Sequence, residues 1–326
     1  MRLFLGIDTS NYTTSAALCD AEGNILLNAK VPLPVKEGER GLRQSDAVFH
    51  HVRNLPEVSE RVGEALRNLP EAVLTAVGCS SVPRDAQGSY MPCFLSGTAA
   101  AQLTAQTMGL PFMKVSHQAG HIMAALASAC RNHGLDCRSM MEQSFLAFHV
   151  SGGTTDTLLC EPDEKRIFRI TQIGGSRDIN GGQALDRTGV KMGLAFPCGV
   201  EMDRAALTYA GKLAKPKLSV DGTWCNLSGL ENKAEQLFKE TGDIAQTSAF
   251  TLDFLAKTLE KITLNAREQY GNLPVIYAGG VMSSAYIRRT LSRYGYFADA
   301  QYASDNAAGV ALLTAELYRR GECKDE

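Results

Sequence analysis

Two histidines, His117 and His121, combine a metal-binding side chain with a spacing that could bring the two rings together. If their segment is a helix, residues four apart lie on one face, one turn from each other. Two imidazoles so placed can bind one metal ion, and Zn and Fe both accept such nitrogen ligands. The spacing leaves a second interpretation open, in which the two histidines are only packed or hydrogen-bonded to water.

The residue after His117 is Gln118, and this excludes one class of metalloenzyme. Zinc proteases with the H-E-x-x-H pattern need a glutamate at this position as their general base. The amide of a glutamine cannot accept that proton. A metal site at the histidine pair would therefore not be the site of a zinc protease.

The segments on either side of the histidines predict how they are positioned. Leu110 to Val115 has the apolar pattern of a short strand, which would deliver the chain to His117. Ala124 to Cys130 continues the expected helix, and Arg131 to Glu142 is expected to be a polar connection. We therefore expect the pair at the start of a helix that directly follows a strand.

A strand, a hydroxyl-rich turn and a second strand occur twice in the chain. Leu3 to Ile7 is an apolar run that leads into the polar turn from Asp8 to Ser15. Phe145 to Val150 leads in the same way into the turn from Ser151 to Thr155. Either turn alone is a weak signal, although such a turn can present amides and hydroxyl groups to a phosphate. Their repetition predicts a duplicated domain whose two halves hold a nucleotide.

Other segments supply glycine loops and helices. Gly174 to Gly182 is glycine-rich, and Val275 to Ala278 is an expected strand that ends at a glycine pair. A helix from about Ser284 follows that pair, and this arrangement can sit against an adenosine or a phosphate. Asp46 to Asn68 has helical spacing of its apolar residues, with Pro56 expected to break that helix or to begin a new one.

Length and composition indicate a soluble protein with two domains or one bilobal unit. The 326 residues are 44% apolar and 21% charged, and the net charge is -2. That charge argues against a strongly basic nucleic-acid binder, although a local basic patch remains open. The nine cysteines are scattered without a C-x-x-C pair, and no stretch is long enough to span a membrane. We therefore expect a cytoplasmic protein with reduced thiols.

Seven motifs, in order along nearly the whole chain, resemble those of the TsaD family, formerly called Gcp and described as an O-sialoglycoprotein endopeptidase of the peptidase M22 type. GIDTS resembles the family's GIETS, VSHQAGHIMAAL its H-x-x-G-H helix, and VSGGTT its VSGGHT. GQALDRTGVKMGLAFPCG resembles GEAFDK and YPGG, and SGLENKAEQL resembles SGLKTA. YAGGV resembles GGV, and SDNAAGVALL resembles TDNAAMIA. Seven motifs in the right order make the resemblance specific.

The resemblance implies an α/β protein with the actin-like ATPase (ASKHA) fold. Two duplicated α/β lobes would enclose a nucleotide cleft between them. The N-terminal lobe would comprise residues 1–127, completed by the C-terminal helix 306–320, and the C-terminal lobe residues 128–305.

The family's chemistry is a metal-dependent acyl transfer. A threonylcarbamoyl group would pass from threonylcarbamoyl-adenylate to N6 of the adenosine beside the tRNA anticodon, with TsaB-like and TsaE-like proteins as partners. The metal would be Fe or Zn, with Mg as a further candidate, and its ligands map to His117, His121 and Asp305. Asp305 also stands at a helix start, where capping is its ordinary role. Asp8 is the one candidate for a catalytic side chain.

An adenine nucleotide or acyl-adenylate would be the second ligand. An aspartate suits ribose hydroxyl groups, and paired glycines let backbone amides approach phosphates. The residues that map to this ligand lie on four segments: His149, Val150, Ser151, Gly152, Gly153, Asp186, Gly199, Asp203 and Ser284.

Several departures from the family pattern mark the chain as a divergent member. The acidic pair of the family's C-D-E-T is lost, because residues 11–14 read Asn-Tyr-Thr-Thr. The SGGHT histidine is Thr154, the asparagine after GGV is Ser284, and a GGVVPE-like loop is replaced by residues 41–46. A paralogue that binds metal and nucleotide is therefore an alternative, either as an ATPase or with another carbamoyl acceptor. A non-catalytic partner subunit is a third, which the retained His117, His121 and Asp305 oppose.

Overall fold

The computed structural model describes residues 1–10, 12–34, 42–302 and 307–321. The chain divides into two compact units. Unit 1 comprises Met1–Ala127, Pro162–Arg169 and Ser304–Glu326, and unit 2 comprises Ser128–Glu161 and Ile170–Ala303. Each unit contains its own sheet and its own hydrophobic core. Asp305 lies outside the described residues.

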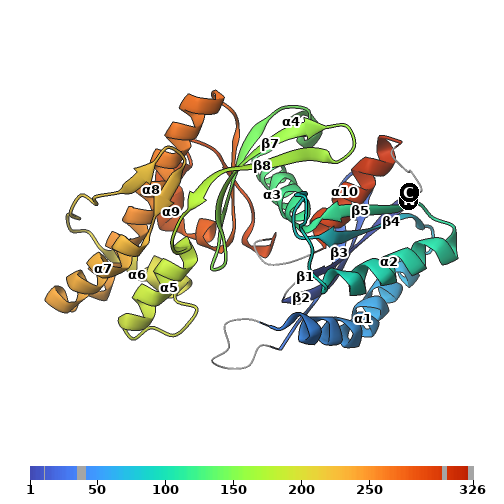
Figure 1. The fold of residues 1–326 in the computed structure, drawn as a ribbon, viewed down its shortest axis with the longest axis horizontal. Helices are drawn as coiled ribbons and strands as arrows, with labels where there is room; N and C mark the ends of the chain where they lie inside the picture. Colours follow the sequence, from blue (N-terminus) through green and yellow to red (C-terminus); the bar gives the residue numbers. More distant parts are fainter. Residues whose placement is uncertain (11, 35–41, 303–306, 322–326) are drawn as a thin grey trace. The chain divides into compact units, whose positions relative to one another are not determined.

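Unit 1 is built on a five-stranded sheet with the strand order β3-β2-β1-β4-β5 (Figure 1). Its strands are β1 (Arg2–Ser10), β2 (Thr13–Asp20), β3 (Ile25–Pro32), β4 (Val73–Val82) and β5 (Phe112–Ser116). Its helices are α1 (Gln44–Arg67), α2 (Phe94–Met108), α3 (His117–His133), which runs on into unit 2, and α10 (Ala308–Arg319). Helices α1 and α2 cover one face of the sheet, and α10 covers the other.

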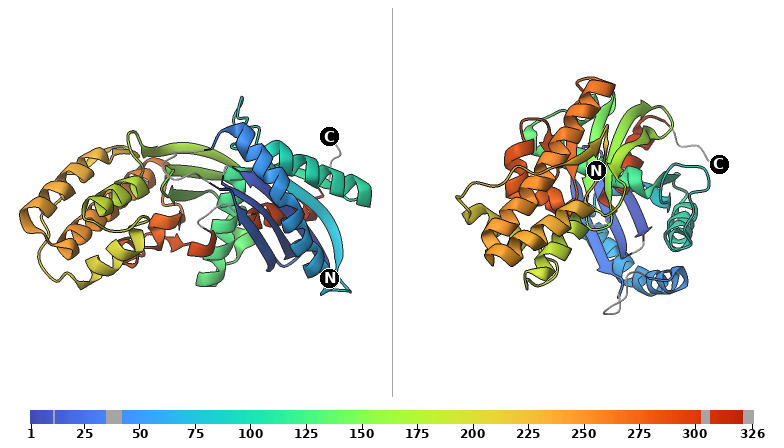
Figure 2. Two further views of the ribbon diagram at one scale, coloured as in Figure 1. Left: turned by 90° about the horizontal axis from the view of Figure 1, so that it is seen from below. Right: turned by 60° about the vertical axis from the view of Figure 1, so that its left-hand side comes forward.

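Unit 2 contains a seven-stranded sheet with the order β12-β11-β6-β7-β8-β10-β9. Its strands are β6 (Phe145–Val150), β7 (Thr155–Asp163), β8 (Ile167–Ser176), β9 (Ser219–Asp221), β10 (Trp224–Asn226), β11 (Val275–Ala278) and β12 (Tyr296–Phe297). Its helices are α4 (Cys137–Met141), α5 (Gly181–Lys191), α6 (Gly199–Thr208), α7 (Ser228–Thr241), α8 (Ile244–Tyr270) and α9 (Ala285–Leu291), with 3-10 turns at Gly280–Ser283 and Ala300–Tyr302. The long helix α8 packs against α5, α6, α7 and α9, which are the yellow and orange coils of Figure 2.

The two sheets repeat one topology. The order β8-β7-β6-β11-β12 in unit 2 corresponds strand for strand to β3-β2-β1-β4-β5 in unit 1. In each unit the first strand forms an antiparallel hairpin with the second, and it pairs in parallel with β4 or β11 on its other side. The expected turn from Ser151 to Thr155 connects β6 to β7, with Thr155 already in β7. The expected turn from Asp8 to Ser15 was too long, because Asp8 to Ser10 belong to β1 and pair with Thr13 to Ser15 of β2. The prediction of an α/β fold with two sheets is confirmed.

Two predictions about helices were wrong. Helix α1 continues without a break through Pro56, because a buried stripe that includes His51, Val58 and Val62 holds both sides of the proline against the sheet. The expected polar connection from Arg131 to Glu142 contains the last turn of α3 and all of α4. Asp136 caps α4 by accepting a hydrogen bond from the Arg138 amide.

The cysteines that the structure describes are all free thiols, and most are buried. None of the described helices is long and apolar enough to cross a membrane.

Candidate active site

The histidine pair lies at the start of α3, which begins directly after β5. The Nε2 atoms of His117 and His121 are 2.9 Å apart, which is a hydrogen-bond distance, so one ring can donate its proton to the other. Two nitrogens that each lie about 2.1 Å from one metal ion are about 3 Å apart at a right angle and about 3.4 Å apart at the tetrahedral angle. The pair therefore has a geometry that fits two ligands of one metal ion.

A buried carboxylate orients the first of these histidines. Asp8, near the end of β1, has no exposed surface and accepts a hydrogen bond from Nδ1 of His117 at 3.0 Å. Ser10 donates to the same carboxylate at 2.8 Å, and Ser80 donates to it from β4. Because a carboxylate oxygen only accepts, Nδ1 of His117 carries the proton. When the ring is neutral, its lone pair is therefore on Nε2, as a metal ligand requires.

The third predicted metal ligand, Asp305, lies outside the described residues. Within the part of the chain that the structure describes, no three His, Cys, Asp or Glu side chains are arranged to hold a metal ion. The described geometry thus contains two converging nitrogens and their orienting carboxylate.

Sequence reasoning missed the serines around this cluster. Ser80 and Ser10 reach Asp8, while Ser116 donates to the Asp85 carboxylate at 2.7 Å and accepts from the Ala119 amide at 3.2 Å. Ser116 therefore caps the start of α3. One signal was available for Ser80: it stands near the carboxyl end of an expected strand, where parallel strands bring their polar residues together.

The positions of the family's acidic pair have a different role in this chain. Tyr12 is 44% exposed, and Thr13 begins β2. The next residue, Thr14, is buried with its hydroxyl 2.9 Å from Nδ1 of His51, which ties β2 to α1. None of these three side chains can act as a carboxylate base.

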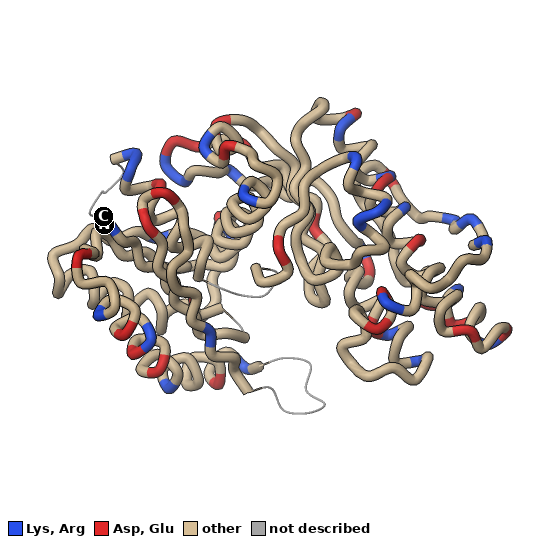
Figure 3. The backbone as a smooth tube through the Cα atoms, turned by 180° about the vertical axis from the view of Figure 1, so that it is seen from behind, with Lys and Arg blue, Asp and Glu red and all other residues tan. Residues whose placement is uncertain are grey.

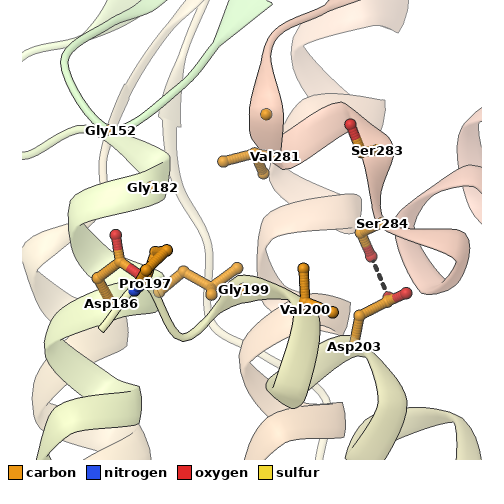
Figure 4. A pocket seen from close by; sticks show the side chains of 12 residues that line it. Gly152, Gly182, Asp186, Pro197, Gly199, Val200, Asp203, Val281, Ser283 and Ser284 are labelled. Atoms are coloured by element: carbon orange, nitrogen blue, oxygen red, sulfur yellow. Dashed lines mark hydrogen bonds between the residues drawn. The ribbon is translucent and has the colours of Figure 1, made fainter. Parts of the chain in front are cut away.

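A separate cavity of about 430 Å³ lies within unit 2 (Figure 4). Five of the residues predicted to bind nucleotide line it: Gly152, Asp186, Gly199, Asp203 and Ser284. Seven further residues complete the lining: Gly182, Leu185, Pro197, Val200, Gly280, Val281 and Ser283. Gly280 and Val281 belong to the strand, glycine pair and helix start that the sequence predicts to sit against an adenosine or a phosphate, whereas Leu185, Val200 and Ser283 were not predicted.

The glycines around the cavity serve two purposes. A Cβ at Gly182 would lie 2.6 Å from the Gly152 nitrogen, and one at Gly279 would overlap the Val150 carbonyl oxygen. These two glycines let α5 and the start of the 3-10 turn pack against the end of β6. A Cβ at Gly152 or Gly280 would meet nothing within 4 Å. There the backbone is open to a ligand.

Asp203 of α6 fixes the start of α9. Its carboxylate accepts hydrogen bonds from the Ser284 hydroxyl and from the amides of Ala285 and Tyr286 at 3.0 and 3.1 Å (Figure 4). Ser284 in turn accepts from the Ile287 amide at 3.2 Å. Both side chains therefore combine a place in the cavity lining with a capping role.

Asp186 of α5 has more capacity for a ligand. One of its carboxylate oxygens accepts from the Cys198 amide at 2.8 Å, and the other accepts no hydrogen bond from any residue that the structure describes. Burial raises the pKa of Asp186, and the hydrogen bond from Cys198 opposes part of that shift. A ligand hydroxyl that donates to this carboxylate would satisfy the second oxygen.

The other four residues predicted to bind nucleotide do not line the cavity. His149 lies in β6, opposite Asp156 and Ala278 of the flanking strands. Val150 belongs to the hydrophobic core of unit 2. Ser151 folds the turn by accepting from the amides of residues 153 and 154, at 3.3 and 3.1 Å, and a Cβ at Gly153 would meet nothing within 4 Å.

The lining of the cavity combines apolar walls, a carboxylate and open glycine backbone. Leu185, Pro197, Val200 and Val281 give it apolar walls, which suit a base or the carbon face of a sugar. Asp186 can accept from a hydroxyl group, and the open glycine backbones allow a phosphate to approach closely.

Comparison with known proteins identifies the family. The family model of TsaD, described as tRNA N6-adenosine threonylcarbamoyltransferase, matches residues 37–312. A protein of that name from Methanopyrus kandleri is 27% identical over 97% of this chain and 88% of its own length. Another from Streptococcus equi subsp. zooepidemicus is 29% identical over 99% of this chain and 94% of its own length.

Among solved structures, full-length HypF in its phosphate- and nucleotide-bound form has a TM-score of 0.57 and 11% identity. The likeness covers 96% of this chain and 46% of HypF, and at this identity it shows the fold alone, which is the actin-like ATPase fold. The family match extends over most of the chain and includes both the histidine pair and the cavity of unit 2. The chain belongs to the TsaD family, a family of acyltransferase enzymes.

Proposed function

We propose that this protein transfers a threonylcarbamoyl group from threonylcarbamoyl-adenylate to N6 of the adenosine next to the anticodon of a tRNA. The observation that supports this most directly is the histidine pair with converging Nε2 atoms and a buried carboxylate on His117. A packed histidine pair needs no such orienting partner, whereas a metal ligand commonly has one.

In this proposal the nucleotide part of the donor binds in the cavity of unit 2. Asp186 accepts from a ribose hydroxyl, and the backbone around Gly152 and Gly280 lies against the phosphate. Val200 and Val281 form apolar walls for the base. Asp203 holds Ser284 and the start of α9 in place, so its role is to position the wall of the cavity.

His117 and His121 would hold the metal ion, with Asp305 as the proposed third ligand. Two imidazoles and one carboxylate suit Fe and Zn similarly. When bound, the metal would supply a Lewis acid for a phosphate or carbamoyl oxygen of the donor. Asp8 keeps the proton of His117 on Nδ1, so that Nε2 remains free of a proton.

The transfer itself exchanges one bond for another. The N6 amine attacks the carbamoyl carbon, a C–N bond forms, and the C–O bond to the adenylate phosphate breaks with release of AMP. The amine also loses a proton, which passes to solvent water as the phosphate leaves. The tyrosine and threonine at positions 12 and 13 do not supply a base for it at neutral pH.

The same departures favour a second candidate function. A chain without the acidic pair and the SGGHT histidine could bind metal and nucleotide but transfer a carbamoyl group to another acceptor, or hydrolyse ATP. A non-catalytic partner subunit is the third candidate. Proteins like TsaB and TsaE are the proposed partners in the first case, and the test therefore includes them.

A complementation experiment separates these candidates. The chain is expressed in cells depleted of their own TsaD, and the modified adenosine is measured by mass spectrometry of digested tRNA. Wild type should restore the modification, and the His117→Ala variant should not. If wild type expresses as a folded protein but restores none, with or without TsaB-like and TsaE-like proteins from its own source, the tRNA acceptor is wrong.

Metal analysis of the purified protein tests the site independently of activity. Wild type should bind close to one equivalent of Fe or Zn, and the variants His117→Ala and His121→Ala should bind far less. Equal, negligible metal in all three proteins would refute the metal site.

We also propose that the two units correspond to the lobes expected from the family, with residues 1–127 and 306–320 in one and 128–305 in the other.

A further inference from the structure

Unit 2 contains a basic segment that the proposed chemistry does not use. Between α6 and β9, residues 209–218 have no regular secondary structure and contain Lys212, Lys215 and Lys217. From Arg204 to Val220 the chain has four basic residues and no acidic one. Figure 3 shows this segment as the run of blue at its right-hand edge. We call residues 209–218 the lysine loop.

The lysine loop is held against the body of unit 2. Tyr209, Leu213 and Leu218 pack on the hydrophobic core from their partly buried positions. Lys233 of α7 donates to the carbonyl oxygen of Lys217 at 3.3 Å. These contacts alternate with the three exposed lysines, so the anchors fix the direction in which the lysines are presented.

The three lysines of the loop form no ion pair with any residue that the structure describes. Other basic side chains of unit 2 are paired, among them Lys191 with Glu231 and Glu235. A surface that keeps several unpaired cations together in a protein of net charge -2 has a cost in repulsion. Binding of a polyanion would relieve that repulsion.

The arrangement fits an extended anion better than a small one. Lys212, Lys215 and Lys217 are spread over six residues without regular secondary structure, so at most about 17 Å of chain separates the first from the last. The backbone of a nucleic acid carries a phosphate at every nucleotide and can contact several lysines distributed in this way. Beside the loop, a cavity of about 290 Å³ is lined by three lysines, one glutamate and apolar side chains, among them Lys215, Lys217, Lys233, Glu240, Leu237 and Phe250. The lysines outnumber the single carboxylate.

We propose that the lysine loop binds the sugar–phosphate backbone of the acceptor tRNA. This inference rests on the proposed function, in which tRNA is the acceptor, and adds to it the surface that contacts the RNA. The contacts are to phosphates, so they contribute affinity and orientation without reading the base sequence.

The test measures tRNA binding by the full-length protein as a function of salt. The probe is an unmodified tRNA transcript with an adenosine next to the anticodon, and the variant carries Lys212→Ala, Lys215→Ala and Lys217→Ala together. A control variant carries Lys114→Ala, Lys165→Ala and Lys261→Ala, three exposed lysines on other elements with the same total charge change. Thermal unfolding checks that both variants are folded.

The loop variant should bind tRNA at least about tenfold more weakly at moderate salt, with the slope of log K against log salt reduced by about 2 to 3. The control variant should stay close to wild type. Equal affinity and slope in wild type and loop variant would overturn the proposal and leave the tRNA acceptor standing. If wild type does not bind tRNA at all, both fall. If the loop variant loses binding while wild type fails in complementation, the loop proposal stands and the transfer reaction does not.

Discussion

Asp8 and His117 are 109 residues apart in the sequence, yet their contact decides which ring nitrogen can bind a metal. Replacing Asp8 by alanine should lower metal affinity about 10- to 100-fold, because the ring loses the partner that fixes its tautomer and orientation. Asp8→Asn should lie between alanine and wild type, since its amide oxygen still accepts from Nδ1. The measurement is metal affinity by competition with a chelator.

Asp85→Asn is the matched control for Asp8. Asp85 is an exposed carboxylate that accepts a hydrogen bond from Ser116 at the start of the same helix, and in the part of the chain that the structure describes it makes no hydrogen bond to either histidine ring. It should leave metal affinity close to that of wild type. Identical affinities for the Asp8→Ala variant and wild type would show that Asp8 does not orient the ligand.

A second prediction concerns Asp186. Burial raises the pKa of its carboxyl group, although the hydrogen bond from the Cys198 amide opposes part of that rise. Its ionised carboxylate is the form that accepts from a ribose hydroxyl, so AMP affinity should be full above the raised pKa and fall as the pH drops through it. The Asp186→Asn variant should bind AMP more weakly at neutral pH and show a flatter pH profile. Calorimetric titration of AMP from about pH 4 to pH 8 measures both.

The same shift has the opposite sign for stability. The carboxyl has its ordinary pKa in the unfolded chain, so the folded state binds the proton more tightly and is relatively favoured at acid pH. If AMP affinity and the unfolding free energy both rose with pH through this range, the titration of a group other than Asp186 would be responsible. An AMP profile unchanged by Asp186→Asn would exclude Asp186 from the nucleotide site.

At the residue scale, the sequence could predict local relations but not distant ones. The i, i+4 spacing is sufficient to place His117 and His121 on one helix face. The contacts of Asp8 with His117 and Ser80 depend on the parallel pairing of β1 with β4 and of β4 with β5, which no local pattern specifies. The capping role of Asp203 could not be predicted for the same reason. Asp203 and Ser284, at the start of α9, are 81 residues apart in the sequence.

Among the elements, helix α7 depends on a cap supplied by another segment. Asp178, in the loop before α5, accepts from the amides of Leu227 and Ser228 at 2.7 and 2.9 Å, and from the Ile179 amide at 2.6 Å. Burial would raise its pKa, but the hydrogen bonds from the Ser228 side chain and from these amides outweigh that effect and lower the pKa to about 2. The loop is thereby tied to the start of α7.

Asp178→Asn should lower the unfolding free energy by about 1 kcal/mol at pH 7, a cap-sized effect reduced by the exposure of this side chain. Because the pKa of Asp178 is lower in the folded state, its carboxylate stabilises the fold at pH values above about 3.8, the pKa in the unfolded chain. This contribution disappears as the pH falls toward 2. The gap between wild type and variant should therefore narrow between pH 5 and pH 2 in urea denaturation.

Asp221→Asn is the control for Asp178. Asp221 has an 81% exposed side chain that pairs with Arg177 and with no other basic residue that the structure describes, so its loss should change stability little at any pH. A gap between wild type and the Asp178→Asn variant that is constant with pH would mean that the cap does not depend on charge.

Element types were predictable wherever the apolar pattern was strong. Phe145–Val150 and Val275–Ala278 are strands with the bounds that the sequence suggests, because both are short apolar runs that end at glycine or serine turns. Pro56 was misleading because a local rule about proline competes with the burial of a whole helix face. Strands β9 and β10 are three residues each, which is too short for a pattern to be visible.

For the whole molecule, the repeated strand–turn–strand pattern predicted the duplication, and the strand orders bear out a shared topology. The order itself could not be derived from the sequence, since it depends on crossover connections between strands that are far apart in the chain. Pro162–Arg169 illustrates the limit: these residues comprise the end of β7, the turn after it and the start of β8, two strands of the unit 2 sheet, yet they belong to unit 1.

The separate cores of the two units lead to a prediction for hydrogen exchange. In unit 1, α3 and α10 pack so closely that a Cβ at Gly309 would overlap the Gly120 carbonyl oxygen and lie 3.0 Å from the Ala124 nitrogen. Because these are backbone atoms, Gly309→Ala should force the helices apart and destabilise unit 1 by about 1 to 3 kcal/mol. Faster exchange should appear in β1, β4 and α10 and not in α7 or α8 of unit 2.

Gly229→Ala is the matched control, because Gly229 lies in α7 and a Cβ there would meet nothing within 4 Å. It removes a glycine from a helix without a clash, so exchange in unit 2 should stay the same or become slower. Asp178→Asn should affect the other unit from Gly309→Ala: hydrogen exchange should become faster in α7 of unit 2 and stay unchanged in β1 of unit 1. Equal acceleration in both units by either destabilising variant would mean that the chain opens as one cooperative body, despite its two cores.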